Sequence, residues 1–291
     1  MKHQIISAAT GSTFRTRVYQ LIAALLLAAS SLLLLAARPV AAATMTVINT
    51  NDSGAGSLRQ AILDANGTVG ADTINFSIGS GAQHIIPASA LPPITQPLNI
   101  DGTSQPGFTG APLIELSGDG AGAGARGLYI TGAATTSTVR GLIINHFSAQ
   151  GIFIDTSSVV IAGNYIGTAA SGMSAAGTGN GGDGIGIFSG TSAASANGNT
   201  IGGVNPADRN VISGNALNGI GMTAQVGGST SSNHIVGNLI GTNAAGTAAL
   251  ANGGDGVLIN HADGGGPATA AGNVIGGDAG ANCSAACNLI S

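Results

Sequence analysis

An internal repeat is the feature that most constrains how this chain folds. The hexapeptide GNYIGT at residues 163–168 returns as GNLIGT at residues 237–242, an offset of 74 residues. NTIGG at 199–203 returns as NVIGG at 273–277 with the same offset, and two further motifs recur in the same order at offsets of 72 and 78. Repeats on this scale are typical of solenoids, in which each unit buries its apolar side only by stacking on its neighbours.

Short apolar cores such as NYIGT, GIGIF and NVISGN lie within each long repeat and begin about 9 to 21 residues apart. Ile, Val or Leu between glycines and asparagines is typical of strands, and no stretch suited to a helical crossover separates the cores. Parallel strands then stack only if the chain coils. The sequence therefore predicts an all-β fold, a right-handed parallel β-helix over residues 81–291 with inward Ile and Val forming one core. The last motif, at residues 288–291, stops where its earlier copy continues, which predicts a β-helix truncated at the C-terminus.

Asparagine recurs at equivalent corners of the predicted coil. This residue tolerates the left-handed backbone of a tight corner and stacks in hydrogen-bonded ladders. An alternative interpretation is a sugar-binding strip, but repetition at equivalent corners favours a structural ladder. The predicted members of the ladder are Asn164, Asn199, Asn210, Asn215, Asn238 and Asn273.

Residues 44–80 follow a different pattern. Met45–Asn49 and Thr73–Phe76 have strand character, and Ser57 with Gln60 three residues later has the form of a helix capping box. Four apolar residues then follow at the spacing of one face of a helix: Leu58, Ala61, Ile62 and Ala65. The first rung of a solenoid is an exposed edge, and a helix packed over it removes that edge. We therefore expect residues 44–80 to form an N-terminal cap with one short helix.

The first 43 residues have the three parts of an export signal. Three basic residues precede an apolar run at residues 21–37, and Ala41–Ala43 offer the small residues needed for cleavage before Thr44. The alternative is an uncleaved membrane anchor, although this run of 17 residues is at the lower end of what a bilayer-spanning helix needs. The sequence predicts a signal peptide over residues 1–43 and a secreted or cell-surface protein, which contacts a membrane only through an uncleaved signal.

The balance of charge beyond the signal limits the partners of this chain. Four arginines face twelve acidic residues there, which gives a formal charge of −8. Nucleic-acid binding depends on Lys and Arg that neutralise phosphates, so we expect no nucleic-acid partner. Ile, Val and Leu recur throughout, so the low content of charge does not indicate disorder.

Two weak signals bear on cross-links and metals. Cys283 and Cys287 predict either a local disulfide or two unpaired thiols in an exported chain. Two GGDG motifs place Asp183 and Asp255 at equivalent repeat positions, where stacked carboxylates are weak candidates for calcium. The favoured alternative is that each aspartate caps its own glycine-rich turn. We expect no catalytic metal and no resident cofactor.

The residues just described also carry a family resemblance. Gly56–Ile62 (GSLRQAI), followed by Gly70–Ile74 (GADTI), resembles the CSLREA-type leader of bacterial surface proteins. Gly56 stands where that motif has cysteine and Gln60 where it has glutamate, so a family disulfide is absent at this position. The GNxIGT, TIGG and NVISGN repeats resemble those of the right-handed parallel β-helix, the pectate-lyase-like superfamily fold. This resemblance covers nearly all of the chain after the signal, and it implies a fold rather than an activity.

Many proteins of this fold act on polysaccharides, with acidic calcium ligands and a basic residue in lyases or with two carboxylates in hydrolases. The chain after residue 43 has no lysine, no adjacent acidic pair and no tryptophan for sugar stacking. Single acids such as Asp155 are spread along the coil, and His146 and His234 are expected to be satisfied surface or corner residues without a pattern of metal ligands. We therefore expect no catalytic residues and predict an adhesin-like structural or interaction module, with polysaccharide or other cell-surface components as partners. The alternatives are a polysaccharide lyase, a glycoside hydrolase or a carbohydrate-binding β-helix.

Overall fold

The structure is a computed structural model that describes two separate parts of the chain. Its described residues are 17–24, 42–175, 177–190, 195–261, 268–277 and 287–291. Residues 17–24 are helical, and the rest of the predicted signal peptide up to residue 41 lies outside the described residues. Among the described residues, no helix has the length and apolar character required to cross a membrane.

Three parallel sheets, here named A, B and C, make up the unit that begins at residue 42. In spatial order, sheet A contains β1 (Thr44–Val47), β2 (Asp72–Phe76), β4 (Leu98–Asp101), β7 (Thr138–Arg140), β10 (Val160–Ala162), β13 (Thr200–Gly202), β16 (His234–Val236) and β19 (Val274–Ile275). Sheet B contains β3 (Gln83–Ile85), β5 (Ile114–Ser117), β8 (Leu142–Asn145), β11 (Tyr165–Ile166), β14 (Val211–Ile212), β17 (Leu239–Ile240) and β20 (Leu289–Ile290). Sheet C contains β6 (Leu128–Thr131), β9 (Ile152–Asp155), β12 (Ile185–Phe188), β15 (Ile220–Ala224) and β18 (Val257–His261).

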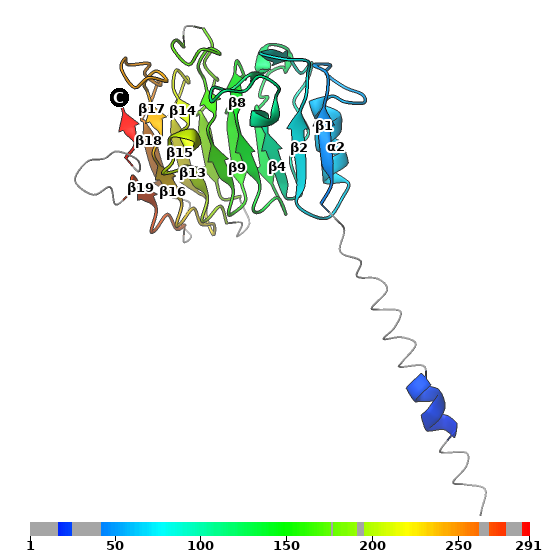
Figure 1. Cartoon of the computed structure of the whole chain (residues 1–291). Helices are drawn as coiled ribbons and strands as arrows, with labels where there is room; N and C mark the ends of the chain where they lie inside the picture. The colour runs from blue at the N-terminus through cyan, green and yellow to red at the C-terminus, as the bar shows by residue number, and fades with distance from the viewer. Residues whose placement is uncertain (1–16, 25–41, 176, 191–194, 262–267, 278–286) are drawn as a thin grey trace, which may run out of the picture. The chain divides into compact units, whose positions relative to one another are not determined.

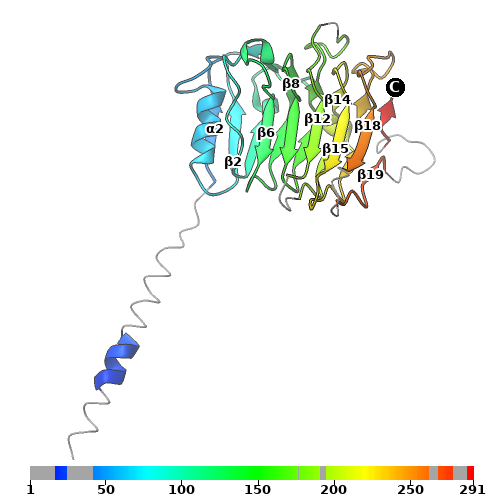
Figure 2. The same cartoon turned by 180° about the vertical axis from the view of Figure 1, so that it is seen from behind.

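The chain visits the sheets in turn, which is the topology of a parallel β-helix. From β4 onward, consecutive strands lie in sheets A, B and C, and the next strand returns to sheet A one rung further on. Figures 1 and 2 show the strands stacked side by side from the blue end at β1 to the red end at β20. The predicted fold class is therefore confirmed.

Inward side chains of successive rungs stack into continuous apolar rows. Ile161 of β10 pairs with Val139 of β7 on one side and with Ile201 of β13 on the other. The same row of sheet A has no exposed surface at any of six positions: Ile74, Ile100, Val139, Ile161, Ile201 and Ile235. Each such side chain contributes roughly 1.5–3 kcal/mol when it is buried. The regular spacing of Ile and Val in the sequence is thus the spacing of rungs.

The predicted asparagines form three ladders instead of one. The ladders are Asn164–Asn210–Asn238–Asn288, Asn199–Asn233–Asn273 and Asn180–Asn215–Asn252. In each step, a side-chain Nδ2 donates to the Oδ1 of the asparagine on the next rung, as Asn210 does to Asn238 at 2.9 Å. At several of these corners the residue before the asparagine is a left-handed glycine, as at Gly163 (φ 68°) and Gly237 (φ 73°). Asparagine therefore supplies the hydrogen bonds of the corner, and glycine supplies its backbone conformation.

Helix α2 (Leu58–Asn66) lies at the N-terminal end of the coil, against β1 and β2 (Figure 2). The four apolar residues predicted at helical spacing are all buried: Leu58, Ala61, Ile62 and Ala65. Ser57 Oγ accepts the Gln60 N–H at 3.2 Å, which is one half of a capping box. The other half is missing, because the Gln60 side chain donates to Asp64 Oδ1 instead of returning to Ser57.

Arg59, the arginine of the leader-like motif, joins this helix to a distant loop. Its two Nη atoms donate to the carbonyl oxygens of Ser89 and Ala90, each at 2.8 Å. It also forms an ion pair with Asp52 at 2.7 Å. The Arg59 guanidinium and the Ala88 N–H hold the pKa of the Asp52 carboxyl below its usual value. The motif therefore has a structural role in the cap.

Candidate functional site

The outer face of sheet C gathers the side chains best suited to bind a ligand. Because strand residues alternate between faces, Ile152 and Ile154 of β9 point into the core and are fully buried, while Phe153 and Asp155 point outward. Parallel register aligns the outward positions of neighbouring strands, and Phe153 lies between Tyr129 of β6 and Gly186 of β12.

Three aromatic rings, Tyr129, Phe153 and Phe188, contact one another on this face, and we call them the aromatic cluster. The ring centroids of Tyr129 and Phe153 are 5.3 Å apart at an interplanar angle of 64°. Those of Phe153 and Phe188 are 5.0 Å apart at 33°. These separations fall in the favourable range for aromatic pairs. Phe153 is buried at the centre, and the two outer rings remain partly exposed.

Gly186 makes this arrangement possible. A Cβ atom at this position would lie 3.2 Å from Phe153 Cδ2 and 3.4 Å from Phe188 Cε2. Both contacts are tighter than an ordinary van der Waals contact, so a larger residue would push the rings apart. Gly221, the next residue in register, also lacks a side chain. The space above these two glycines is taken by neighbouring side chains, the rings and Gln150 at Gly186 and Asp183 at Gly221.

Arg126 lies over the aromatic cluster. Its guanidinium carbon is 4.0 Å from the Phe153 centroid and 5.1 Å from the Tyr129 centroid, within the range of cation–π interactions. Its Nε donates to Gln150 Oε1 at 3.1 Å, and this bond orients the guanidinium. A fixed cation and two partly exposed ring edges thus share one surface.

Asp155 adds a carboxylate beside the rings. Burial raises the pKa of Asp155 above its usual value, while the Gly190 N–H, the Tyr129 hydroxyl and the charge of Arg126 act in the opposite direction. Its Oδ1 is buried and has no hydrogen-bond partner in the described part of the chain. A buried oxygen without a partner costs free energy, so the fold holds this carboxyl group in an unfavourable setting.

A hollow of about 450 Å³ opens at Asp155. Apart from Asp155, its lining residues are small or bear hydroxyl groups: Thr131, Gly132, Thr135, Thr156, Ser157 and Ser195. Aromatic rings with a few convergent polar groups are characteristic of small-molecule sites. Apolar C–H faces of a sugar stack on rings, and sugar hydroxyls donate to carboxylates and accept from serine and threonine.

The predicted pair Asp183 and Asp255 does not come together. Asn218 lies between them, because Ile185, Ile220 and Val257 are in register and the three residues occupy the same position relative to them. Asp183 Oδ1 accepts the Asn218 N–H at 3.0 Å and its Nδ2 at 2.8 Å, and Asn218 Oδ1 accepts the Asp255 N–H at 2.9 Å. Across the described residues, no three His, Cys, Asp or Glu side chains are placed to hold a metal ion.

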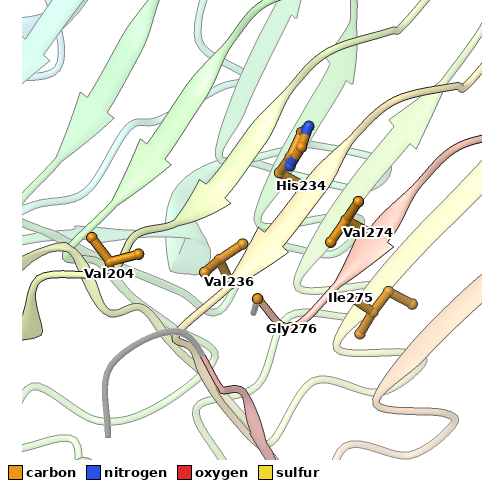
Figure 3. A pocket seen from close by; sticks show the side chains of 7 residues that line it. Val204, His234, Val236, Val274, Ile275 and Gly276 are labelled. Atoms are coloured by element: carbon orange, nitrogen blue, oxygen red, sulfur yellow. The ribbon is translucent and has the colours of Figure 1, made fainter. Parts of the chain in front are cut away.

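Other predicted residues have mainly structural surroundings. His146 has a polar partner, because its Nδ1 lies 3.0 Å from Asp119 Oδ1. His234 is an exposed residue of β16 and borders a hollow on sheet A (Figure 3). Cys283 lies outside the described residues, so its disulfide with Cys287 stays a prediction.

The aromatic cluster was missed in the sequence, where the absence of tryptophan argued against a sugar-stacking surface. Tyr129, Phe153 and Phe188 are separated by 24 and 35 residues, and only the register of the coil brings them together. A signal was nevertheless present. Tyr129 and Phe153 both stand directly after the first apolar residue of a GLYI or GIFI motif, which is an outward position in sheet C.

The fold and the three ladders define this chain as a parallel β-helix repeat protein with a mixed aromatic and polar face on sheet C. Comparison with known protein families finds no match, and comparison with curated proteins finds none either.

Proposed function

We propose that this protein is a non-catalytic, exported β-helix that binds an uncharged, hydroxyl-rich glycan on the outer face of sheet C. One observation carries the proposal. Asp155, whose buried Oδ1 has no hydrogen-bond partner among the described residues, lines a hydroxyl-rich hollow beside the aromatic cluster. The partly exposed parts of Tyr129 and Phe188 offer apolar contact to a sugar, and the polar groups beside them are suited to its hydroxyls.

The charges of the chain favour a neutral glycan. Asp155 lies on β9 of sheet C, and Asp183 lies two residues before β12 of the same sheet. The whole chain beyond the signal carries a formal charge of −8. Arg126 is held over the rings by Gln150, and its charge acts on Asp155. An acidic polysaccharide would meet net repulsion here.

Binding without turnover is the simpler function for this geometry. Hydrolysis of a glycosidic bond needs two carboxyl groups at a defined separation. The chain after residue 43 contains no adjacent acidic pair and no lysine, which are groups that hydrolases and lyases of this fold use. Polysaccharide lyase or glycoside hydrolase activity therefore ranks second.

Export and surface display complete the proposal. The signal-like residues 1–43 and the resemblance of residues 56–74 to a CSLREA-type leader support an adhesin-like protein that is secreted or attached to the cell surface. In that setting, a long face built from stacked rungs holds several sugar units of one chain at once.

The test is a polysaccharide panel with the chain from Thr44 onward. Retention on immobilised neutral glycans and release of reducing or unsaturated ends are recorded together. We expect retention without product, and a loss of about tenfold or more in affinity for Tyr129→Ala, which removes a partly exposed ring of the aromatic cluster. Tyr165→Ala is the matched control, because it removes a ring from sheet B and should leave affinity unchanged. Product release that is abolished in Asp155→Asn would instead establish an enzyme, and equal loss in both tyrosine variants would rule out this site.

A further inference from the structure

Loops cover the outer face of sheet B in the middle of the coil. Because strand residues alternate between faces, Tyr165, Val211 and Leu239 point away from the core, and they are in register on β11, β14 and β17. Val211 and Leu239 are nevertheless buried, and Tyr165 is partly buried. Two loops meet over this face, where the Ala244 N–H donates to the Gly172 carbonyl at 2.9 Å. The face is therefore covered by the chain itself.

A hollow of about 90 Å³ remains between these loops and the sheet. Val211, Leu239 and Pro206 contribute apolar side chains to its lining, and Tyr165 and Arg209 contribute polar ones. None of its lining residues belongs to the last strands of the sheets, so the hollow lies on the side of the coil. A water molecule takes up about 30 Å³ in the liquid, so a ligand of only a few heavy atoms fits.

Arg209 reaches the hollow from the end of the 3-10 turn η3 (Pro206–Asp208). Its Nε donates to the Gly237 carbonyl at 2.8 Å, which orients the guanidinium. Its two Nη groups have no hydrogen-bond partner among the described residues, whereas each of the other three arginines beyond the signal has a carboxylate or an aromatic ring as a partner. Oriented donors on a positive charge are suited to an anion that accepts two hydrogen bonds.

Tyr165 offers a second donor to the same hollow. Its hydroxyl has no hydrogen-bond partner in the described part of the chain. Burial raises the pKa of Tyr165 above its usual value, so the hydroxyl keeps its proton at neutral pH. The loop fixes the ring, because a Cβ atom at Gly172 would lie 2.7 Å from Tyr165 Cε2 and 2.7 Å from Ala244 Cβ. The hollow thus has a cation and a hydroxyl donor on an apolar floor.

These groups are complementary to a small carboxylic acid in its ionised form. A guanidinium binds a carboxylate through two parallel hydrogen bonds, a phenol donates to the same oxygens, and apolar side chains cover a short alkyl tail. Inorganic phosphate would place polar oxygens against the apolar lining, which is unfavourable. A sugar ring exceeds the volume of the hollow.

We propose that the hollow on sheet B is a binding site for a short aliphatic monocarboxylate, held by Arg209 and Tyr165. The site is independent of glycan binding, which uses the outer face of sheet C. The carboxyl end of a peptide has the same chemistry, so the test includes a compound that represents it.

The test is a titration of the chain from Thr44 onward, followed by NMR at the Nε–H signals of its four arginines. The Arg209 signal is assigned by its loss in Arg209→Gln. The probe is propionate at constant ionic strength, compared with chloride, phosphate, 1-propanol and N-acetylalanine, which stands for a peptide end. We expect a saturable shift of the Arg209 signal with propionate alone. In Tyr165→Phe, which keeps the ring, propionate should bind about tenfold or more weakly.

Tyr129→Phe is the matched control, because it removes the other phenol hydroxyl beyond the signal, on sheet C, and should leave propionate affinity unchanged. Equal affinities in the two tyrosine variants would overturn the role of Tyr165. No saturable shift with propionate would overturn the site, and an equal shift with phosphate or chloride would overturn its selectivity for carboxylates. Tighter binding of N-acetylalanine would identify a peptide end as the ligand in place of a free acid.

Discussion

Asp155 lies in an environment that opposes its charge. Burial raises the pKa of its carboxyl, and one of its oxygens has no partner among the described residues. By contrast, Asp52 is held in its charged form by Arg59, which lowers its pKa. Asp52 thus stabilises the fold, whereas Asp155 costs stability at neutral pH. A residue that is unfavourable for folding is a good candidate for function.

Replacement of Asp155 by asparagine should therefore remove the loss of stability that the Asp155 carboxylate causes at neutral pH. An acid whose folded pKa is raised stabilises the fold only below its unfolded pKa, near 3.8, and that contribution is lost as the pH rises through the folded value. We expect Asp155→Asn to unfold at a higher urea concentration than the wild type at pH 7, with a smaller difference at pH 3.5. Urea titrations at both values measure this, with Asp183→Asn as the control. Destabilisation by Asp155→Asn at pH 7 would mean that the carboxylate has a structural role.

At the scale of the element, the asparagine ladders explain how strands of only two residues can form a stable coil. Strands of sheet B such as β11 and β14 have two residues each, too few to hold a corner in place. Asn210, which is fully buried at such a corner, accepts from Asn164 and donates to Ile161 O at 2.8 Å and to Asn238. Each asparagine therefore joins three rungs, and the corners contribute to cohesion along with the strands.

Asn210→Ala should be strongly destabilising. It leaves a buried amide of Asn164 and the carbonyl of Ile161 without partners, and each unsatisfied group costs about 1–3 kcal/mol. We expect a loss of about 3 kcal/mol in the free energy of unfolding, measured by denaturant titration. Asn205→Ala, at an exposed asparagine that bonds only Asp208, should change it by less than about 0.5 kcal/mol. Comparable losses in the two variants would contradict the ladder as a source of stability.

At the scale of the whole molecule, stability should vary along the coil. A solenoid is held by contacts between neighbouring rungs, so its ends open more readily than its middle. The two ends also differ, because α2 covers β1 while β18, β19 and β20 have exposed inward side chains.

Hydrogen exchange of the chain from Thr44 onward tests this gradient. We expect amides of β10 to exchange on the order of a hundredfold more slowly than those of β19, with β2 closer to β10 than to β19. The reason is that Ile161 is covered by a rung on each side, whereas Ile275 is covered on one side only. Uniform protection along the coil would mean that all rungs unfold as one cooperative unit.

The sequence by itself determined the coil. Repeats at nearly constant offsets, Ile and Val at the spacing of rungs and asparagine at each corner are local patterns, and each rung contacts little except its neighbours. The capping helix followed from local rules as well, since its four apolar residues and Ser57 lie within nine positions. Only the tertiary structure decided the site. Tyr129, Phe153 and Phe188 come from three different rungs, with Asp155 on the same strand as Phe153, and whether they meet depends on the register between strands and on the missing side chain of Gly186. Loop lengths differ from rung to rung, so residues that are neighbours in space have no fixed separation in sequence.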